Sequence, residues 1–273
     1  MLLRTRAGQR LAESLGLAKS LRHPIVVGGT GGSGTRAVRD LLIRAGVSMG
    51  TNVNGPGDAL DFEPFLGRWI NPILESTETL AFRAEDLPAS IRRRATREFH
   101  RRMRRYLRTI PSGQRWGWKN PRSIYILPLI HFLIPGFYFV HVVRDGRDMA
   151  VSSNQNQYRK HFSSLFHATR SEAEQVMESC TMWARTNGEV ADWCERVLGN
   201  RYVRLRLEDL CKTPREVAAN LLGALDLEVS RADDAVIALK TPATIERWRT
   251  LPNEISERLT SVAGDTLRRF GYE

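Results

Sequence analysis

The chain has 273 residues, of which 42% are hydrophobic and 26% are charged, and its formal net charge is +11. This composition is typical of a soluble globular protein with a substantial core. The positive charge favours an anionic ligand, an anionic surface, or both. The three cysteines are odd in number and lack metal-type spacing, which argues against a disulfide framework and against a zinc site, so we expect no bound metal.

The first 23 residues lack a long apolar core followed by a small-residue cleavage site. We therefore predict no secretory signal, an amphipathic N-terminal helix and a cytoplasmic location. Residues 124–143 are about as long and apolar as a membrane span, but they contain Pro128, Pro135 and Gly136. We interpret this stretch as a helix, a break and a buried strand, and predict no transmembrane span.

A glycine-rich loop follows the first predicted strand. Residues 25–27 form an apolar run with β-branched side chains, and five of the next eight residues are glycine. From Thr35 onward the apolar residues recur with helical spacing as far as Gly46. A strand, a glycine loop and a helix N-terminus direct several backbone N–H groups at one point, which favours binding of an anion such as phosphate.

Two nucleotide-binding motifs overlap in this loop, and each is incomplete. Gly29, Gly31 and Gly34 match G-x-G-x-x-G, but the acidic ribose partner expected about 20 residues later is missing. Gly29 and Gly34 also have P-loop spacing, but Thr35 and Arg36 stand where Lys and Ser or Thr belong. A nicotinamide- or ATP-dependent enzyme is therefore the weaker alternative.

Residues 46–64 are rich in Gly, Asn, Pro and acidic residues and are predicted to form an irregular loop at the rim of the site. Asp58, Asp61 and Glu63 are its carboxylates, and each is either a catalytic base or a solvated loop acid or helix cap. From about residue 58 to 113 the pattern is mainly helical. We predict one domain over residues 1–273 with a helical insertion there.

The second half of this helical region is strongly basic. Ile91, Phe99, Met103 and Leu107 form an apolar stripe beside arginines, as on a surface helix. This basic face is either a solvated surface or a docking site for an acidic acceptor. Because no nucleic-acid-binding signature accompanies it, we do not expect a nucleic-acid partner. The arginines are Arg92, Arg93, Arg94, Arg97, Arg101, Arg102, Arg104, Arg105 and Arg108.

Two further strands are predicted to end beside the glycine loop. Residues 115–119 predict a short strand ending at Lys119, and residues 137–143 predict a buried strand that leads to Arg144 and places His141 in the core. A helix between them makes a right-handed crossover in a parallel sheet. Lys119 and Arg144 are therefore expected at the edge where open α/β sheets bind ligands.

The rest of the chain is predicted to be helical around one more strand. Helices are expected over residues 171–198 and 214–225, with a strand over residues 202–207 between them. A final helix follows residues 245–249. We find no internal repeat or low-complexity linker.

Taken in order, these motifs resemble those of the sulfotransferases that use 3'-phosphoadenosine 5'-phosphosulfate (PAPS), especially the bacterial and tyrosylprotein-type branch. GGTGGSGTR is similar to the family's 5'-phosphosulfate loop and FVHVVRDGRDMAVSS to its 3'-phosphate motif, with WKNPR, LEDL and ERWR in the same order. The resemblance implies a three-layer αβα fold with a central parallel sheet, similar to P-loop NTPases. It also implies sulfonate transfer to a hydroxyl or amine acceptor, which is a carbohydrate, a lipid, a peptide tyrosine or a small metabolite.

The resemblance also assigns a donor site. In the family, the arginine at the strand end of the 3'-phosphate motif and a serine eight residues later hold the donor's 3'-phosphate. These two positions match Arg144 and Ser152. A guanidinium can grip a terminal phosphate through two parallel hydrogen bonds. The residues expected to bind the donor are Gly31, Gly32, Ser33, Gly34, Thr35, Arg36, Arg144, Ser152, Trp248 and Arg249.

Sulfonyl transfer requires in-line placement, stabilisation of charge on the leaving oxygen and a base for the acceptor. We expect Lys119, together with Arg36, to neutralise the sulfonate or the leaving oxygen. Tyrosylprotein-type relatives place a carboxylate in the loop after the first helix. The candidate bases are accordingly Asp61, Glu63 and Asp58.

Two positions depart from the family pattern. Many relatives carry Lys or Arg where this chain has Gly32, so we expect Lys119 or Arg36 to substitute for the missing cation. Leu207 stands where relatives often have an aromatic residue near adenine, and Trp248 supplies either that stacking or a core contact. The missing loop cation and the arginine-rich helix leave open a third alternative, a catalytically silent binder of polyanions.

Overall fold

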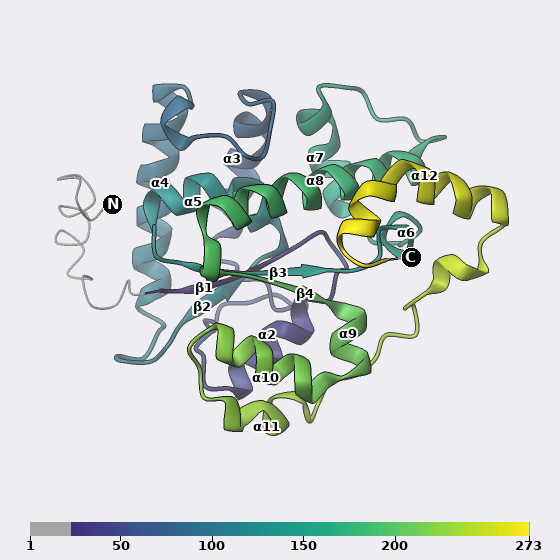
Figure 1. Ribbon diagram of the computed structural model, residues 1–273. Helices are drawn as coiled ribbons and strands as arrows, with labels where there is room; N and C mark the ends of the chain where they lie inside the picture. The colour runs from purple at the N-terminus through teal and green to yellow at the C-terminus, as the bar shows by residue number, and fades with distance from the viewer. Residues whose placement is uncertain (1–22, 273) are drawn as a thin grey trace.

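The computed structural model describes residues 23–272, and a sheet of four parallel strands lies at its centre (Figure 1). The strand order is β2-β1-β3-β4. Because every pairing is parallel, the carboxyl ends of all strands lie at one edge of the sheet. The strands are β1 (Ile25–Gly28), β2 (Gly117–Lys119), β3 (Tyr138–Val143) and β4 (Tyr202–Arg206).

Helices cover both faces of this sheet (Figure 1), which confirms the predicted three-layer α/β fold. Val26 and Phe139 face one helical layer, whereas Val27 and Val140 face the other, as the alternation of strand side chains requires. The first layer contains α3 (Glu63–Glu75), α4 (Ala89–Leu107), α5 (Leu127–Leu133), α7 (Asn156–Phe166) and α8 (Gln175–Val197). The second contains α2 (Thr35–Arg44), α10 (Pro214–Ala224) and α11 (Ala232–Val236).

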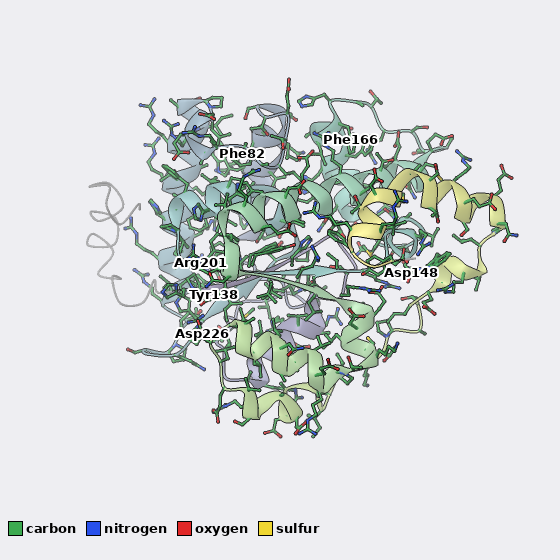
Figure 2. The ribbon with its side chains drawn as sticks, in the orientation of Figure 1. Phe82, Tyr138, Asp148, Phe166, Arg201 and Asp226 are labelled. Atoms are coloured by element: carbon green, nitrogen blue, oxygen red, sulfur yellow. The ribbon has the colours of Figure 1, made fainter. Side chains whose placement is uncertain are left out.

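A third apolar cluster closes the carboxyl end of β3. Met149 of α6 (Gly146–Ala150), Trp183 of α8 and Leu267 of α12 (Asn253–Arg269) belong to it. The segment before α12 includes η6 (Arg247–Thr250) and crosses over α6. Figure 2 places Asp148 of α6 at the opposite end of the sheet from Tyr138 and Asp226.

The mainly helical range around residues 58–113 contains α3, η2 (Ala84–Asp86) and α4. Its aromatic side chains pack directly on β2, since the ring centroids of Phe62 and Trp118 are 4.9 Å apart. The Tyr106 hydroxyl of α4 also donates a hydrogen bond to the Gly117 carbonyl. This range therefore supplies much of the first layer's core, and its status as an insertion stays a prediction.

Most predicted elements are present, but the short helices α9 (Leu207–Lys212) and α11 were not predicted, and two further differences concern α5 and α7. The predicted helix over residues 124–133 consists of η3 (Pro121–Ile126) followed by α5, and α7 was not predicted. α7 is held by apolar residues such as Tyr158 and Phe162, spaced four apart, which are buried in the first layer's core. None of the helices within residues 23–272 has the length and apolar character needed to cross a membrane. The predicted N-terminal helix lies outside the described residues.

Candidate active site

The glycine loop between β1 and α2 has a shape that other residues cannot adopt without strain. A Cβ atom on Gly29 would lie 2.3 Å from the Val142 carbonyl oxygen. Gly34 has φ of 93°, and a Cβ there would lie 2.5 Å from Cδ1 of Leu207. The loop is therefore pressed against β3 and against the start of α9 (Leu207–Lys212).

The same loop presents hydrogen-bond donors that nothing in the described chain uses. The backbone N–H groups of Gly32, Gly34 and Thr35 reach no protein acceptor within residues 23–272. The buried hydroxyls of Thr30 and Ser33 also lack a partner there. Since α2 has no acidic residue in its first turn, its N-terminus is open to an anion, and these donors fit a phosphate-type group.

A cleft of about 450 Å³ opens beside this loop. It brings together many of the residues predicted from the sequence, and it also includes residues to which the sequence analysis assigned no role. The predicted residues that line it are Gly31, Gly32, Gly34, Thr35, Arg36, Asp58, Glu63 and Lys119. The others are Asn54, Pro56, Asn120, Pro121, Arg122, Asn154, Asn156, Gln157 and Lys160.

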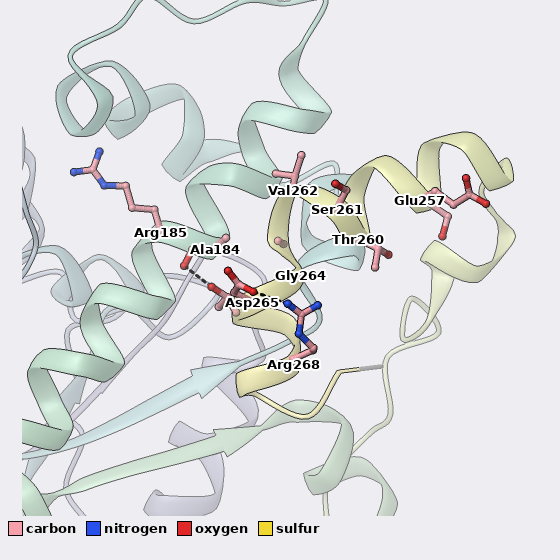
Figure 3. Close-up of a pocket in the computed structure, with 12 residues that line it drawn as sticks. Ala184, Arg185, Glu257, Thr260, Ser261, Val262, Gly264, Asp265 and Arg268 are labelled. Atoms are coloured by element: carbon pink, nitrogen blue, oxygen red, sulfur yellow. Dashed lines mark hydrogen bonds and ion pairs between the residues drawn. The ribbon is translucent and has the colours of Figure 1, made fainter.

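A second hollow, of about 730 Å³, lies between α8 and α12 (Figure 3). It contains none of the predicted site residues. Asp265 in its wall is paired with Arg268 at 2.5 Å, and the Thr266 hydroxyl donates to the Ala184 carbonyl oxygen at 3.3 Å. The predicted chemistry is therefore concentrated at the glycine-loop cleft.

Lys119 is the buried cation of the cleft, with a side chain only 1% exposed. Its ammonium group donates to Oδ1 of Asp58 at 2.5 Å and to the carbonyl oxygen of Pro56 at 2.7 Å. Burial lowers the pKa of Lys119, Asp58 raises it, and the positive charges of Arg39 and Arg36 lower it, so that the net shift is downward. Lys119 is thus held rigidly at the end of β2, next to the loop.

Glu63 is the more accessible carboxylate of the cleft, with a side chain 38% exposed. It accepts hydrogen bonds from Nη2 of Arg122 at 2.5 Å and from Nδ2 of Asn120 at 3.0 Å. Burial raises the pKa of Glu63, but Arg122, Asn120 and the charge of Lys160 lower it more, so the net pKa lies below its usual value. Glu63 is therefore ionised at neutral pH.

Asp61 does not line the cleft, although it was predicted together with Glu63. Its buried carboxylate accepts a hydrogen bond from Nδ2 of Asn52 at 3.2 Å and lies 3.4 Å from Nε of Arg105 on α4. Of the three candidate bases, the structure brings Asp58 and Glu63 to the cleft and turns Asp61 toward α4.

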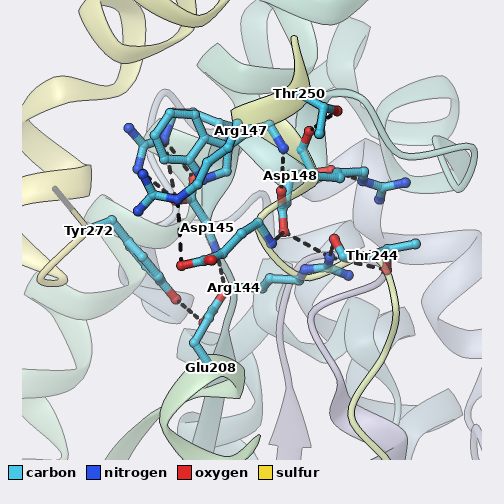
Figure 4. A network of polar contacts seen from close by, with 12 residues as sticks. Arg144, Asp145, Arg147, Asp148, Glu208, Thr244, Thr250 and Tyr272 are labelled. Atoms are coloured by element: carbon cyan, nitrogen blue, oxygen red, sulfur yellow. Dashed lines mark hydrogen bonds and ion pairs between the residues drawn. The ribbon is translucent and has the colours of Figure 1, made fainter. Parts of the chain in front are cut away.

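Arg144 lies on the other side of the glycine loop, in a buried polar network (Figure 4). Its Nη2 donates to Asp148 at 2.8 Å and also to the carbonyl oxygen of Thr244. The fully buried Asp148 also accepts hydrogen bonds from the backbone N–H groups of Glu246 at 2.8 Å and Trp248 at 3.0 Å. One carboxylate therefore fixes both Arg144 and the segment of residues 244–248.

Ser152, Trp248 and Arg249 also lie outside the cleft lining. The Ser152 hydroxyl lies 3.9 Å from where a Cβ on Gly32 would stand, so it adjoins the loop. The Arg147 guanidinium lies over the Trp248 ring, 3.5 Å from its centroid, and that of Arg249 lies 4.7 Å from it. Stacking of Trp248 on adenine stays a prediction, since in this structure the ring contacts arginines.

Sequence reasoning missed the cleft residues contributed by α7 and by the turn before it. Asn156 and Lys160 are four residues apart and share one face of α7. The run Asn-Gln-Asn-Gln at residues 154–157, directly after the predicted 3'-phosphate motif, was the available signal. It lacked apolar periodicity and was not assigned to any element.

Comparisons with known proteins identify the family and support the fold. Residues 24–231 match the family model described as the sulfotransferase family. Sulfotransferase STF1 from Mycobacterium tuberculosis has a similar structure, with a TM-score of 0.51 and 15% identity over 93% of this chain and 81% of that one. STF9 from Mycobacterium avium has a TM-score of 0.56 and 14% identity over 97% and 82% of the two chains.

The sulfotransferase domain of the Synechococcus PCC 7002 olefin synthase has a TM-score of 0.53 and 16% identity over 92% of this chain and 96% of that one. No curated protein sequence matches the chain. The structural likenesses support the fold, and the match over residues 24–231 extends over most of the sequence. The chain belongs to the sulfotransferase family.

Proposed function

We propose that the protein transfers a sulfonate group from PAPS to a hydroxyl or amine acceptor. The observation that carries this proposal is the open N-terminus of α2 next to a buried, fixed Lys119. Unused N–H groups, two unpaired hydroxyls and a lysine at one point suit a donor with several negative charges. When bound, PAPS supplies a sulfonate activated by its anhydride link to a phosphate.

The loop and α2 bind the donor's 5' side in this proposal. The backbone N–H groups of Gly32, Gly34 and Thr35 and the hydroxyls of Ser33 and Thr35 donate hydrogen bonds to it, and Arg36 adds a positive charge at the rim. Lys119 takes the place of the basic residue missing at Gly32, because it reaches the same cleft from β2. A preorganised cation at the leaving oxygen acts without reorganisation during the reaction.

Arg144 and Ser152 bind the 3'-phosphate in this proposal. Arg144 has a buried Nε without a partner in the described chain, so its guanidinium retains a donor. Ser152 adjoins Gly32, which places it between the loop and α6. The contacts of Trp248 and Arg249 make them further candidates at this end.

Glu63 is the proposed base. It lines the cleft, is ionised and is partly exposed, so one of its carboxylate oxygens can take the acceptor's proton. Asp58 also lines the cleft, but it is bound to Lys119. We therefore assign Asp58 to holding Lys119 in position.

Thermal unfolding with different nucleotides tests the donor. We expect adenosine 3',5'-bisphosphate to stabilise the protein by about 2.7 kcal/mol at 100 times its dissociation constant, with no shift from ADP or NAD at equal concentration. Arg36→Ala weakens this binding, whereas Arg44→Ala, at the far end of the same helix, leaves it unchanged. Equal stabilisation by ADP or NAD contradicts the proposal. Stabilisation by heparin with none by adenosine 3',5'-bisphosphate also contradicts it.

A further inference from the structure

The cleft beside the glycine loop also carries information about the acceptor. Building on the proposed function, we infer that the acceptor is a polyhydroxylated anion, namely a saccharide that bears carboxylate or sulfate groups. The acceptor hydroxyl meets Glu63, and the anionic group of the saccharide binds Lys160 on α7. This inference concerns the wall of the cleft formed by Glu63, by the turn before α7 and by α7 itself.

The chemistry of the lining favours a polar acceptor. Among the described residues that form the cleft, Pro56 and Pro121 are the only apolar ones outside the glycine loop, and no aromatic or long aliphatic side chain takes part. Sites for phenols, steroids and lipids are lined mainly by apolar and aromatic groups. A flat apolar acceptor, or a nucleic-acid base that stacks on an aromatic ring, would have no aromatic or long aliphatic side chain of the cleft lining to contact.

The five amides of the cleft fall into two groups. Three of them are used within the protein and shape its walls. Asn54 bonds with Asp58, Asn120 bonds with Glu63 and the Arg122 N–H, and Gln157 bonds with Tyr125 and the Gly29 carbonyl. The other two, Asn154 and Asn156, are exposed.

Asn154 and Asn156 have no side-chain hydrogen bond to any residue in the described range. Each offers one acceptor and two donors, which is the set that recognises hydroxyl groups. Nδ2 of Asn154 lies 3.7 Å from where a Cβ on Gly31 would stand, so this amide borders the donor loop. Asn154 therefore borders the donor loop, and Asn156 lines the same cleft from the first turn of α7.

Lys160 adds a positive charge at the same wall. It is exposed, it lines the cleft, and no ion pair joins its ammonium group to an acidic residue within residues 23–272. Glu63 lines the same cleft, and the charge of Lys160 is the smallest of the influences that lower the pKa of Glu63. Glu63 is already neutralised by Arg122, which leaves Lys160 available to an anionic group of the acceptor.

Together these residues discriminate among the acceptor classes. A saccharide supplies several hydroxyls for Asn154 and Asn156, and its carboxylate or sulfate supplies the partner for Lys160. A tyrosine peptide would place an aromatic ring against amides and charges. A neutral sugar would leave Lys160 without its ion pair, so the negative charge is part of the inference.

Calorimetry on the protein saturated with adenosine 3',5'-bisphosphate measures acceptor binding without turnover. The probes are a tetrasaccharide of alternating glucuronate and N-acetylglucosamine, the neutral maltotetraose, free glucuronate and 2-naphthol. We expect the acidic tetrasaccharide to bind at least tenfold more tightly than maltotetraose, and 2-naphthol to show no binding. Free glucuronate distinguishes a monosaccharide acceptor from a longer saccharide chain. If free glucuronate and the acidic tetrasaccharide bind with equal affinity, the acceptor is the monosaccharide.

Lys160→Ala and Arg159→Ala form a matched pair, because both residues are exposed cations on α7 and only Lys160 lines the cleft. Lys160→Ala is expected to weaken binding of the acidic tetrasaccharide by about tenfold or more, as loss of a charge-assisted hydrogen bond does, while Arg159→Ala leaves it unchanged. Asn156→Ala is expected to weaken the acidic and neutral saccharides to similar extents. Unchanged melting temperatures verify that the variants fold.

The outcomes separate the inference from the proposed function. Absence of any stabilisation by adenosine 3',5'-bisphosphate defeats the proposed function itself. With that nucleotide bound, tighter binding of 2-naphthol, or no binding of the acidic tetrasaccharide, overturns the acceptor inference alone. Tetrasaccharide binding that survives Lys160→Ala but is lost when Arg97 and Arg104 are both changed to Ala places the anion on α4, and that also overturns it.

Discussion

Basic residues occur in two settings in this protein, and the settings differ in what balances their charge. At the end of β3, Arg144 and Arg147 are buried, and each is paired with a carboxylate at 2.8 and 2.7 Å. Most arginines of α4 face solvent, with Arg101 69% and Arg105 71% exposed, and the nearest acidic atoms to these two are 3.6 and 3.4 Å away. The buried arginines at the end of β3 therefore have fixed positions, whereas the exposed arginines of α4 mainly add positive charge to the surface.

This difference separates arginines that are held in a defined position from arginines that mainly raise the net charge of the protein. A buried ion must be compensated by a partner in good geometry, so each buried arginine has a specific position. An exposed pair contributes about 0–1 kcal/mol and is screened by salt. The arginine-rich helix dominates the charge of the sequence, yet the cleft with the predicted site residues is lined by other cations.

The largest expected effect comes from Arg144→Ala, which leaves the fully buried Asp148 without its cation. Removing one partner of a buried pair typically costs about 3–5 kcal/mol of the free energy of unfolding. Urea unfolding measures this loss. The double variant Arg144→Ala with Asp148→Asn is expected to recover part of it, because no buried charge is left over. A loss below about 1 kcal/mol would show that the pair resembles the exposed ones.

Lys119→Ala tests the buried cation of the cleft. We expect kcat to fall by about a hundredfold to a thousandfold, because a preorganised charge in the transition state contributes about 2.7–4 kcal/mol. Arg36→Ala is expected to lower turnover less, since Arg36 is exposed, and Arg44→Ala serves as the control on the same helix. Rates unchanged in both Lys119→Ala and Arg36→Ala would refute the roles assigned to them.

Buried bases without an acidic partner extend the comparison to pH. Desolvation lowers the pKa of His141 to about 3 and that of His161 to about 3. The imidazole pKa in an unfolded chain is about 6.5, so between these values the unfolded chain binds more protons. The contribution of these two neutral histidines to the free energy of unfolding is fully present above about pH 6.5. It falls as the pH drops toward 3, by about 1.4 kcal/mol per pH unit for each histidine.

Urea unfolding at a series of pH values between 7.5 and 4.5 measures this dependence. Nδ1 of His161 donates a 2.6 Å hydrogen bond to Oδ1 of Asn71, and His161→Gln retains a polar group there without the titration. We expect the slope of the variant to be smaller than that of the unchanged protein by about 1.4 kcal/mol per pH unit. Equal slopes would mean that His161 is not held neutral.

The smallest effect is expected on α4. Arg97 is exposed and has no ion pair within the described residues, so Arg97→Ala should change the free energy of unfolding by no more than about 0.5 kcal/mol. Urea unfolding in low and high salt checks this. A loss above about 1 kcal/mol would erase the distinction between the two settings.

Local patterns in the sequence were sufficient to predict the glycine loop and the strand ends. The apolar run before Gly28, the glycines and the helical spacing after Thr35 all fall within one short stretch. Lys119 ends one recognisable strand, and Arg144 follows another. Parallel pairing then brings these ends to one edge. His141, predicted in the core, is fully buried.

The remaining parts of the site depend on contacts between distant segments. Asp61 and Glu63 are two residues apart, and the difference between them is set by Arg105 and Arg122, which come from other elements. The contact of Trp248 with Arg147 arises because the segment before α12 crosses α6. Such pairings leave no local pattern in the sequence.

The glycine loop is shaped by segments that follow it in the sequence by more than a hundred residues. Gly29 lies against the backbone of Val142, and Gly34 lies against Leu207 at the start of α9. A chain emerging from the ribosome therefore contains the loop's residues long before it contains the surfaces that mould them. The anion site can form only when synthesis has passed Leu207, so a nascent or truncated chain that ends earlier is expected to be unable to retain the nucleotide.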